Sequence, residues 1–319
     1  LNVILELGVG PDGTPAGKAL DLVMNGARTR LSDDVVHLVT PRAPIDPELS
    51  AAPVWQQFAP MVWLAEDERN LPYSADAFIA NSELMWSATP CPSPLLAAAG
   101  EVDANKLKSG GYIAHEQLDG CSRNGREWRT NQPSRPKNYD SMGFYLNLRD
   151  SEYKGVGSSA PVYVQFKDKE YVIYWLPYAY NDAPAEDWDH EGDWERIGVQ
   201  LNQHNQPTGV VFWGHDHHCV VPWSTAAKEG DRPVVFSAKG THASYPKVGT
   251  YRFNFVDHTN EGTRWETWRQ LKLVEREPWW GYAGGWGDVG RWTNQTGPAG
   301  PYPERDVSAV KTTEPCQFR

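Results

Sequence analysis

Residues 161–177 read PVYVQFKDKEYVIYWLP, and this stretch decides the fold. Val162, Val164 and Phe166 alternate with more polar neighbours, which is the period of a half-buried β-strand. Lys and Asp then interrupt the pattern, and a dense run of apolar and aromatic residues follows from Tyr171 to Pro177. The stretch therefore predicts two consecutive strands.

Similar short runs continue towards the carboxyl end, each bounded by turn-forming residues. The chain has 28 Gly and 25 Pro, and they interrupt its second half at short intervals. Further strands are predicted at 195–201, 208–214, 233–239, 250–256 and 271–275. Seven strands without long intervening helices predict a mainly β protein with a β-sandwich fold.

The amino-terminal part is less regular, and we expect residues 1–140 to form an elaboration packed on a sandwich of residues 141–319. One short helix is predicted to begin at Ser74, because serine is a good N-cap residue. Residues 118–139 are polar and contain Cys121, which predicts a long surface loop held by a disulfide. A separate amino-terminal domain is the alternative.

Composition excludes several classes of partner and predicts export. The net charge of -11 argues against nucleic acid as a partner, and no apolar run is long enough for a transmembrane segment. The start at Leu1 suggests a processed chain, and the sequon at Asn294 fits a secreted protein. The four cysteines lack the spacing of a zinc site, so we expect the disulfides Cys91–Cys121 and Cys219–Cys316. The other two pairings and four free thiols in a cytosolic protein remain alternatives.

Chemistry is concentrated in residues 182–195, which read DAPAEDWDHEGDWE. So many carboxylates in one segment call for a positive counter-ion. Asp193 and Glu195 are two residues apart, so in a strand they share the face that Ile197 continues. Oxygen ligands favour Ca²⁺ or Mg²⁺, with Mn²⁺ or Zn²⁺ as alternatives. The plainer reading is that Asp193 or Glu195 forms an ordinary ion pair with Arg196 or another arginine, and that the remaining acids belong to a solvated loop.

Two later segments also carry histidines at predicted strand ends. His215 follows Trp213 and Gly214, and His242 lies two residues after Gly240. Histidines in such places serve as metal ligands, proton donors or ligand contacts. His217 and His218 are read as part of a solvated loop.

The motifs HEGDWE (190–195) and AKGTHASYP (238–246) resemble the family named after vacuolar protein sorting protein 62. Phe58-Ala59-Pro60 through Asp67-Glu68, followed by Leu71-Pro72 and Phe78, resembles the amino-terminal part of that family. The resemblance covers roughly residues 55 to 300.

A more distant similarity links the chain to the necrosis-inducing Nep-like secreted cytolysins, which are β-sandwiches. Their heptad Gly-His-Arg-His-Asp-Trp-Glu aligns with residues 189–195, but its Gly, Arg and second His are replaced here. The resemblance implies a divalent-cation site and a sandwich of Nep-like, jelly-roll type. The metal ligands that it implies are Asp182, His190, Asp193 and Glu195. It also points to His215 and His242 as residues that contact a ligand.

Aromatic residues crowd the segment 278–303, where they are suited to stacking on sugar rings. Trp286, together with Trp213 further upstream, is predicted to contact a ligand. The alternative is that the aromatic residues of this segment belong to the hydrophobic core. The aromatic residues considered in this segment are Trp279, Trp280, Tyr282, Trp286 and Trp292.

These observations predict a secreted, divalent-cation-dependent recognition protein that binds a glycan or a phosphorylated lipid headgroup, as cytolysins do at a membrane surface. The alternative is a metal-dependent hydrolase of a phosphodiester or glycosidic bond, in which Glu191, His215 and His242 carry the proton transfers. A third reading is a structural surface protein with a stabilising cation.

Overall fold

The chain forms two compact units, Leu1–Ala52 and Pro53–Arg319. The computed structural model describes residues 4–9, 15–24, 27–30, 52–87, 94–116, 125–133, 143–183, 189–215, 217–252, 256–288 and 297–317. The first unit contains one antiparallel sheet with the strand order β1 (Ile4–Val9), β2 (Pro15–Met24) and β3 (Ala27–Arg30). The division at residue 52 lies well before the expected boundary at residue 140, and residues 53–140 belong to the second unit.

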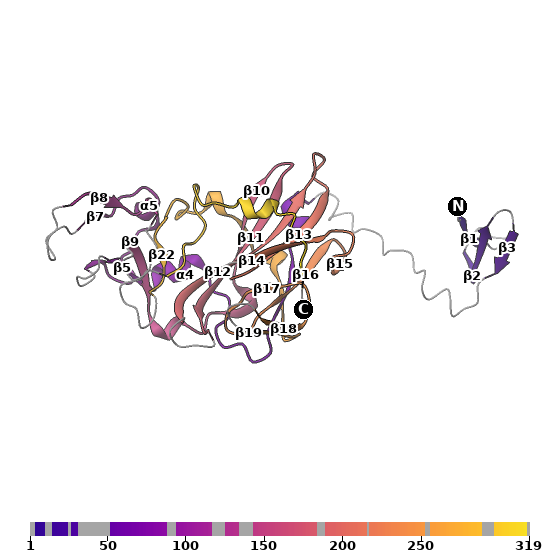
Figure 1. Ribbon diagram of the computed structural model, residues 1–319, viewed down its shortest axis with the longest axis horizontal. Coiled ribbons are helices and arrows are strands. Elements are labelled where there is room, and N and C mark those ends of the chain that lie inside the picture. Colours follow the sequence, from indigo (N-terminus) through magenta and orange to yellow (C-terminus); the bar gives the residue numbers. More distant parts are fainter. Residues whose placement is uncertain are drawn as a thin grey trace. The chain divides into compact units, whose positions relative to one another are not determined.

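A six-stranded sheet forms the centre of the second unit (Figure 1). Its order is β14 (His217–Pro222), β13 (Pro207–Gly214), β12 (His190–Leu201), β11 (Tyr171–Asn181), β10 (Val162–Lys167) and β21 (Leu271–Leu273). The strands predicted at 161–168 and 171–177 are confirmed as the antiparallel pair β10 and β11.

A five-stranded sheet packs against the six-stranded sheet. It consists of β15 (Lys228–Glu229), β16 (Arg232–Ser237), β4 (Met61–Leu64) and β20 (Thr263–Glu266), with β17 (Ser244–Tyr245) paired to β16. Strand β4 runs parallel to β16, with Val62 opposite Val235, and antiparallel to β20. The amino-terminal part of the chain therefore supplies a central strand of the sandwich.

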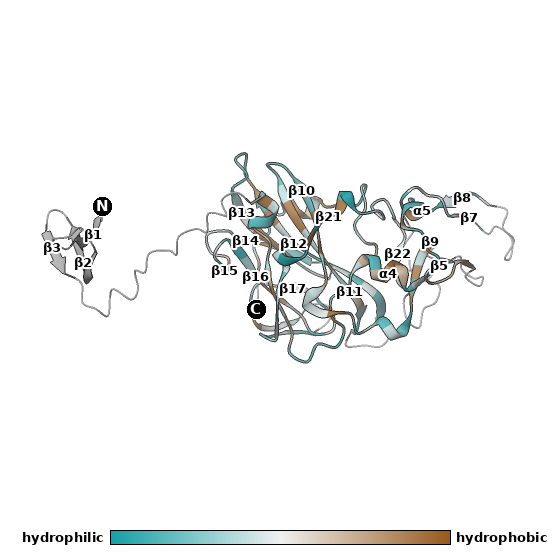
Figure 2. Ribbon diagram, turned by 180° about the vertical axis from the view of Figure 1, so that it is seen from behind, coloured by the Kyte–Doolittle hydropathy of each residue, from teal (hydrophilic) through white to brown (hydrophobic). Residues whose placement is uncertain are grey.

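The core between these two sheets explains why the strands alternate in character. Tyr174, Leu176, Ile197 and Val199 from the six-stranded sheet pack with Trp265 and other apolar residues of the opposing sheet. Burial of such apolar surface is the main driving force of folding. In Figure 2 brown marks hydrophobic residues along β10 and β13. The structure is thus mainly β with a sandwich-type fold, as predicted.

The other face of the six-stranded sheet is also buried, against a four-stranded sheet and two short helices. The order of this sheet is β22 (Gly285–Trp286), β9 (Gly143–Leu148), β5 (Ser82–Ser87) and β6 (Leu95–Ala97). The helix predicted at Ser74 is α4 (Ala75–Ala80), and the Ser74 side chain caps it by accepting a hydrogen bond from the amide of Ala77. Nearby lie α5 (Ala104–Lys108) and the hairpin of β7 (Ile113–His115) and β8 (Glu127–Arg129).

Aromatic residues fill this second core. Trp279, Tyr282 and Trp286 are buried and pack edge to face against one another and against Trp194. These three aromatic residues of the segment therefore serve the core rather than a sugar. Trp292 and the sequon at Asn294 lie outside the described residues.

The remaining described elements are short. The strand predicted at 250–256 is instead two antiparallel strands, β18 (Gly249–Arg252) and β19 (Val256–Thr259). The strand predicted at 271–275 ends at Leu273, where a 3₁₀ turn begins. The short helices are α3 (Val54–Gln57), η1 (Asp150–Glu152), η2 (Gly157–Ser159), η4 (Thr267–Arg269), η5 (Val274–Arg276) and η6 (Ser308–Lys311).

The described residues test one of the two expected disulfides. The disulfide Cys219–Cys316 is present, and it ties the carboxyl-terminal segment to the edge strand β14. Cys91 and Cys121 lie outside the described residues. None of the helices in the described ranges has the length and apolar character needed to cross a membrane.

Candidate functional site

Strand β12 carries the acidic residues to the edge of the sandwich core. Asp193 and Glu195 lie on the same face as Ile197 and Val199, which are fully buried between the two sheets. Asp193 lies opposite Tyr178 of β11, and Glu195 lies opposite Leu176. The change from apolar to acidic along one face of the strand is the one that its spacing predicted.

His242 reaches this face from the turn between β16 and β17. The turn is closed by backbone hydrogen bonds from Ala238 to Ala243 and from His242 to Ala238. His242 itself has a φ of 56°, in the left-handed region that residues other than glycine seldom occupy. Its ring stacks on Tyr178 with centroids 3.9 Å apart and planes inclined by 7°. The fold thus holds this imidazole in one orientation.

Two carboxylates flank the buried imidazole. The Nδ1 atom of His242 lies 3.0 Å from Oδ2 of Asp193, and Nε2 lies 3.8 Å from Oε2 of Glu68. The second distance is too long for a hydrogen bond, and Nε2 has no hydrogen-bond partner among the described residues. Glu68 therefore acts on His242 mainly through its charge, while its own Oε2 accepts a 2.7 Å hydrogen bond from the amide of Gly240.

These contacts favour a charged imidazole. Burial opposes the charge, but the bond to Asp193 and the nearby carboxylate of Glu68 outweigh it and raise the pKa of His242 to about 9. Burial likewise works against the charge of Glu68, yet His242 and the amides of Gly240 and Asn70 lower the pKa of Glu68 to about 2. At neutral pH the positive charge that the acidic segment requires is supplied in part by His242.

For Glu195 the charges of His242 and Arg196 do not outweigh burial. No donor among the described residues forms a hydrogen bond with its carboxylate, although part of the residue stays accessible to solvent. Burial first, and then the neighbouring charge of Asp193, raise the pKa of Glu195 well above its usual range. A carboxylate in this position is either protonated or paired with a cation.

Asp257 of β19 is a second buried acid, and it lies beside the acidic cluster formed by Glu68, Asp193 and Glu195. Its carboxylate bonds to three side chains. Its carboxylate oxygens lie 2.6 Å from the hydroxyls of Thr241 and Tyr245 and 2.9 Å from Nε2 of His215. Burial opposes ionisation, but these bonds lower the pKa of Asp257. His215, like His242, has a left-handed backbone with a φ of 54°. Both predicted histidines therefore bond to a buried aspartate.

The other two expected metal ligands lie at the same end of the strands. Asp182 directly follows β11, and its amide donates to the carbonyl of Gly240 in the His242 turn. His190 begins β12, and its Nδ1 atom lies 2.7 Å from the carbonyl oxygen of Gly192. Such a backbone contact orients an imidazole and leaves Nε2 available, as is common in metal-binding histidines.

A complete set of metal ligands is not assembled in this structure. No group of three or more His, Cys, Asp or Glu side chains has the arrangement of a metal site within the described ranges. Asp193 and Glu195 nevertheless offer adjacent oxygen ligands. Mg²⁺ often uses only one or two carboxylates and keeps its waters, so this pair is chemically suited to a hard cation.

Three predicted site residues occupy structural positions. Glu191 accepts hydrogen bonds from the amides of Leu148 and Asp288 and from the hydroxyl of Tyr153. Burial raises its pKa to about 7. Trp213 and Trp286 are only 4% and 1% exposed, so neither offers a ring face to solvent.

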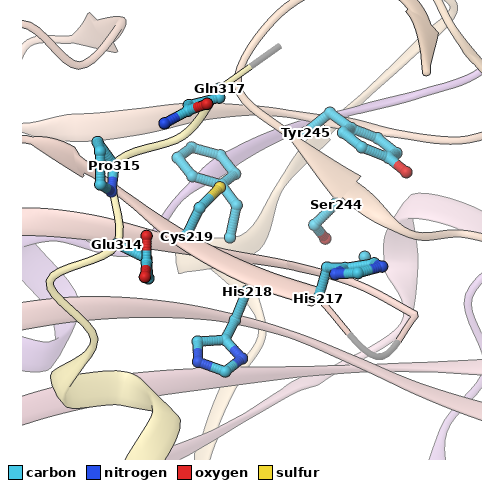
Figure 3. A pocket seen from close by; sticks show the side chains of 10 residues that line it. His217, His218, Cys219, Ser244, Tyr245, Glu314, Pro315 and Gln317 are labelled. Atoms are coloured by element: carbon cyan, nitrogen blue, oxygen red, sulfur yellow. The ribbon is translucent and has the colours of Figure 1, made fainter. Parts of the chain in front are cut away.

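A pocket of about 340 Å³ opens near the acidic cluster, between the edge of β13 and β14, strand β17 and the carboxyl-terminal segment (Figure 3). Ser244, Tyr245, His217, His218 and Glu314 supply its polar groups. The hydroxyl of Ser244 is buried and has no hydrogen-bond partner among the described residues. Tyr245 links this pocket to the acidic cluster through its bond to Asp257.

Sequence reasoning missed Glu68, Asp257 and Tyr245 as members of the site. Glu68 and Asp257 come from loops or short strands far from the acidic segment in sequence. The only local signal was that Glu68 and Tyr245 lie inside the motifs that carry the family resemblance. Comparison with protein-family models, with curated proteins and with solved structures finds no match to this chain.

Proposed function

We propose that this protein is a secreted recognition protein that uses a divalent cation, Ca²⁺ or Mg²⁺, to bind a sugar or phosphorylated lipid headgroup. The observation that carries the proposal is the Glu195 carboxylate, which lies beside Asp193, faces a buried cluster and has no donor among the described residues. A cation between these two carboxylates would remove the cost of burying them together.

The surroundings of the pair support a site that holds both an ion and a ligand. Asp182 and His190 lie at the same end of the strands and can add oxygen or nitrogen ligands. The pocket lined by Ser244 and Tyr245 offers unsatisfied and polar groups to a small hydroxylated molecule. A disulfide is typical of exported proteins, which agrees with a headgroup at a cell surface.

We propose that the chain is a member of the family named after vacuolar protein sorting protein 62 and a distant relative of the Nep-like cytolysins. The hydrolase alternative gains less support, because Glu191, one of its three expected proton carriers beside His215 and His242, has its carboxylate held by three donors.

Cation binding is the first test. Titration of EDTA-treated protein with CaCl₂ and with MgCl₂ in a calorimeter should give one site, and Asp193→Asn and Glu195→Gln should each weaken it at least about tenfold, since each removes a charged ligand. Glu191→Gln is the matched control, because it changes an acid of the same strand whose contacts are structural. Unchanged affinity in both site variants would refute the proposal.

The second test concerns the ligand. Soluble sugars and sugar phosphates should bind the wild type only when the cation is present, and Ser244→Ala should weaken that binding. Binding that does not require the cation would show that the pocket works independently of Asp193 and Glu195.

A further inference from the structure

The opposite face of β12 carries a guanidinium between two indoles. Arg196 lies directly across from Trp175 of β11, and Trp213 of β13 flanks it on the other side. The Cζ atom of Arg196 is 5.2 Å from the ring centroid of Trp175 and 4.9 Å from that of Trp213. Side chains alternate across a strand, so this row faces away from Asp193 and Glu195.

Among the residues that the structure describes, Arg196 has no acceptor for its hydrogen-bond donors. Its Nη1 atom is buried without a partner, and neither a hydrogen bond nor an ion pair of its side chain occurs among the described residues. The indole Nε1 of Trp213 is buried and unpartnered in the same way. By contrast, Trp175 donates its Nε1 hydrogen to Gln165 at 3.3 Å.

A second guanidinium lies over the same indole. Arg305 comes from the carboxyl-terminal segment, and its Cζ atom is 5.0 Å from the centroid of Trp175. Its Nη1 atom donates to the carbonyls of Ala299 and Gly300. Burial and the charge of Arg196 lower the pKa of Arg305 to about 10, so the two cations act on each other.

The segment that contributes Arg305 is fixed over this face of the sheet. Gln200 donates hydrogen bonds to the carbonyls of Val310 and Thr312 at 2.9 and 2.8 Å. Gly198 allows the close approach, because a Cβ atom at this position would lie 2.7 Å from Val310. The arrangement of the two arginines is therefore built into the fold.

Cation–π contacts do not replace a counter-ion here. Such a contact stabilises a cation by less than the cost of burying that cation without a partner. The charge of Glu195 acts first on Arg196 and that of Asp306 second, but neither carboxylate forms an ion pair with the guanidinium among the described residues. The carboxylate of Asp306 already accepts a hydrogen bond from the amide of Ser308. Neither guanidinium therefore has an anionic partner in direct contact among the described residues, and the indole N–H of Trp213 has no acceptor there.

We propose that Arg196 and Arg305, together with the indole N–H of Trp213, form a binding site for a phosphate-type oxyanion. Guanidinium groups bind phosphate through paired hydrogen bonds, and two of them match the double charge of phosphate or a phosphate monoester. The anion is either free phosphate or the phosphoryl end of a larger molecule. The site lies across the sheet from the proposed cation site, and the charge of Glu195 acts on both of its arginines.

Calorimetry in EDTA with inorganic phosphate and with glycerol 3-phosphate tests the site. The wild type should bind one equivalent, and Arg196→Met and Arg305→Met should each weaken binding at least tenfold. Arg232→Met is the matched control, because Arg232 also lies over an indole, 4.2 Å from Trp268, but donates to the carbonyls of Gln56 and Ala59. It should retain wild-type affinity.

The same variants give a second readout in thermal unfolding. Phosphate should raise the melting temperature of the wild type more than chloride of equal ionic strength, and Arg196→Met should lose this difference while remaining at least as stable as the wild type without phosphate. An equal effect of chloride, or phosphate affinity retained in both arginine variants, would overturn the proposal. If Arg196→Met does not fold, Arg305→Met decides the matter in the same way.

The two ligands distinguish the sources of the anion. Tighter binding of glycerol 3-phosphate identifies a phosphorylated molecule as the ligand, and tighter binding of inorganic phosphate identifies the free ion. Because EDTA is present throughout, failure of the cation proposal leaves this result unaffected.

Discussion

Replacing His242 by Gln should remove a part of the stability that depends on pH. The imidazole is fully buried between Asp193 and Glu68, and these carboxylates raise its pKa from 6.5 to about 9. At about 1.36 kcal/mol for each tenfold change in proton affinity, the difference corresponds to about 3 kcal/mol. The lowered pKa of Glu68 reflects the same contact with His242, so the two shifts describe one contribution to stability.

The sign of the pH dependence follows from the raised pKa of His242. The folded protein binds the proton more tightly than the unfolded chain, so the stabilisation is complete below pH 6.5, declines as the pH rises and is lost above about 9. Glutamine does not titrate in this range, so the difference between wild type and variant isolates His242. That difference should shrink by about 3 kcal/mol between pH 6.5 and 9.

Urea unfolding at a series of pH values, without reducing agent and with EDTA present, measures the difference directly. Asp193→Asn, which removes one of the two flanking carboxylates, should show a smaller pH-dependent step against its own His242→Gln double variant. A difference between wild type and His242→Gln that stays constant from pH 6.5 to 9 would refute the charged imidazole.

Three further outcomes follow from the described contacts. Gly240→Ala should lower the free energy of unfolding by about 1 to 3 kcal/mol, because φ is +78° and the new Cβ would lie 2.3 Å from a backbone oxygen. Gly230→Ala is the control, since its φ is +61° but the space around it is open, and it should lower the free energy of unfolding by less. Urea unfolding compares the two variants. Tyr245→Phe should cost about 1 to 3 kcal/mol in the same assay, because it removes a 2.6 Å hydrogen bond to a buried aspartate. Reduction of Cys219–Cys316, which closes a separation of 97 residues, should cost about 2 to 5 kcal/mol, and unfolding with and without dithiothreitol measures it.

The sequence predicted the elements whose signal is local. Alternation located β10, a dense apolar run located β11, and short runs bounded by turn residues located most of β12 and β13. The two-residue spacing placed Asp193 and Glu195 on the face that continues into the core. The N-cap at Ser74 located α4. These predictions succeeded because side-chain burial along one strand or helix repeats with its period.

The sequence did not predict features that depend on contacts between distant segments. Strand β4 is a run of only four residues, Met61–Leu64, and its role became visible only through its pairing with β16. Likewise, the carboxylates of Glu68 and Asp257 reach the histidines across the sandwich, and no spacing along the chain reports such proximity. The excess of acid in residues 182–195 was read as a need for a metal, whereas part of the compensating charge comes from His242.

The parallel pairing of β4 with β16 also determines when this protein can fold. Met61 leaves the ribosome long before Val234, its partner in the register. At typical synthesis rates the delay is on the order of ten to thirty seconds. Throughout that time the apolar residues of β4 have neither of their neighbouring strands, since β20 follows later still. The nascent chain should therefore depend on chaperones, and slow refolding should reflect the closure of this long-range contact.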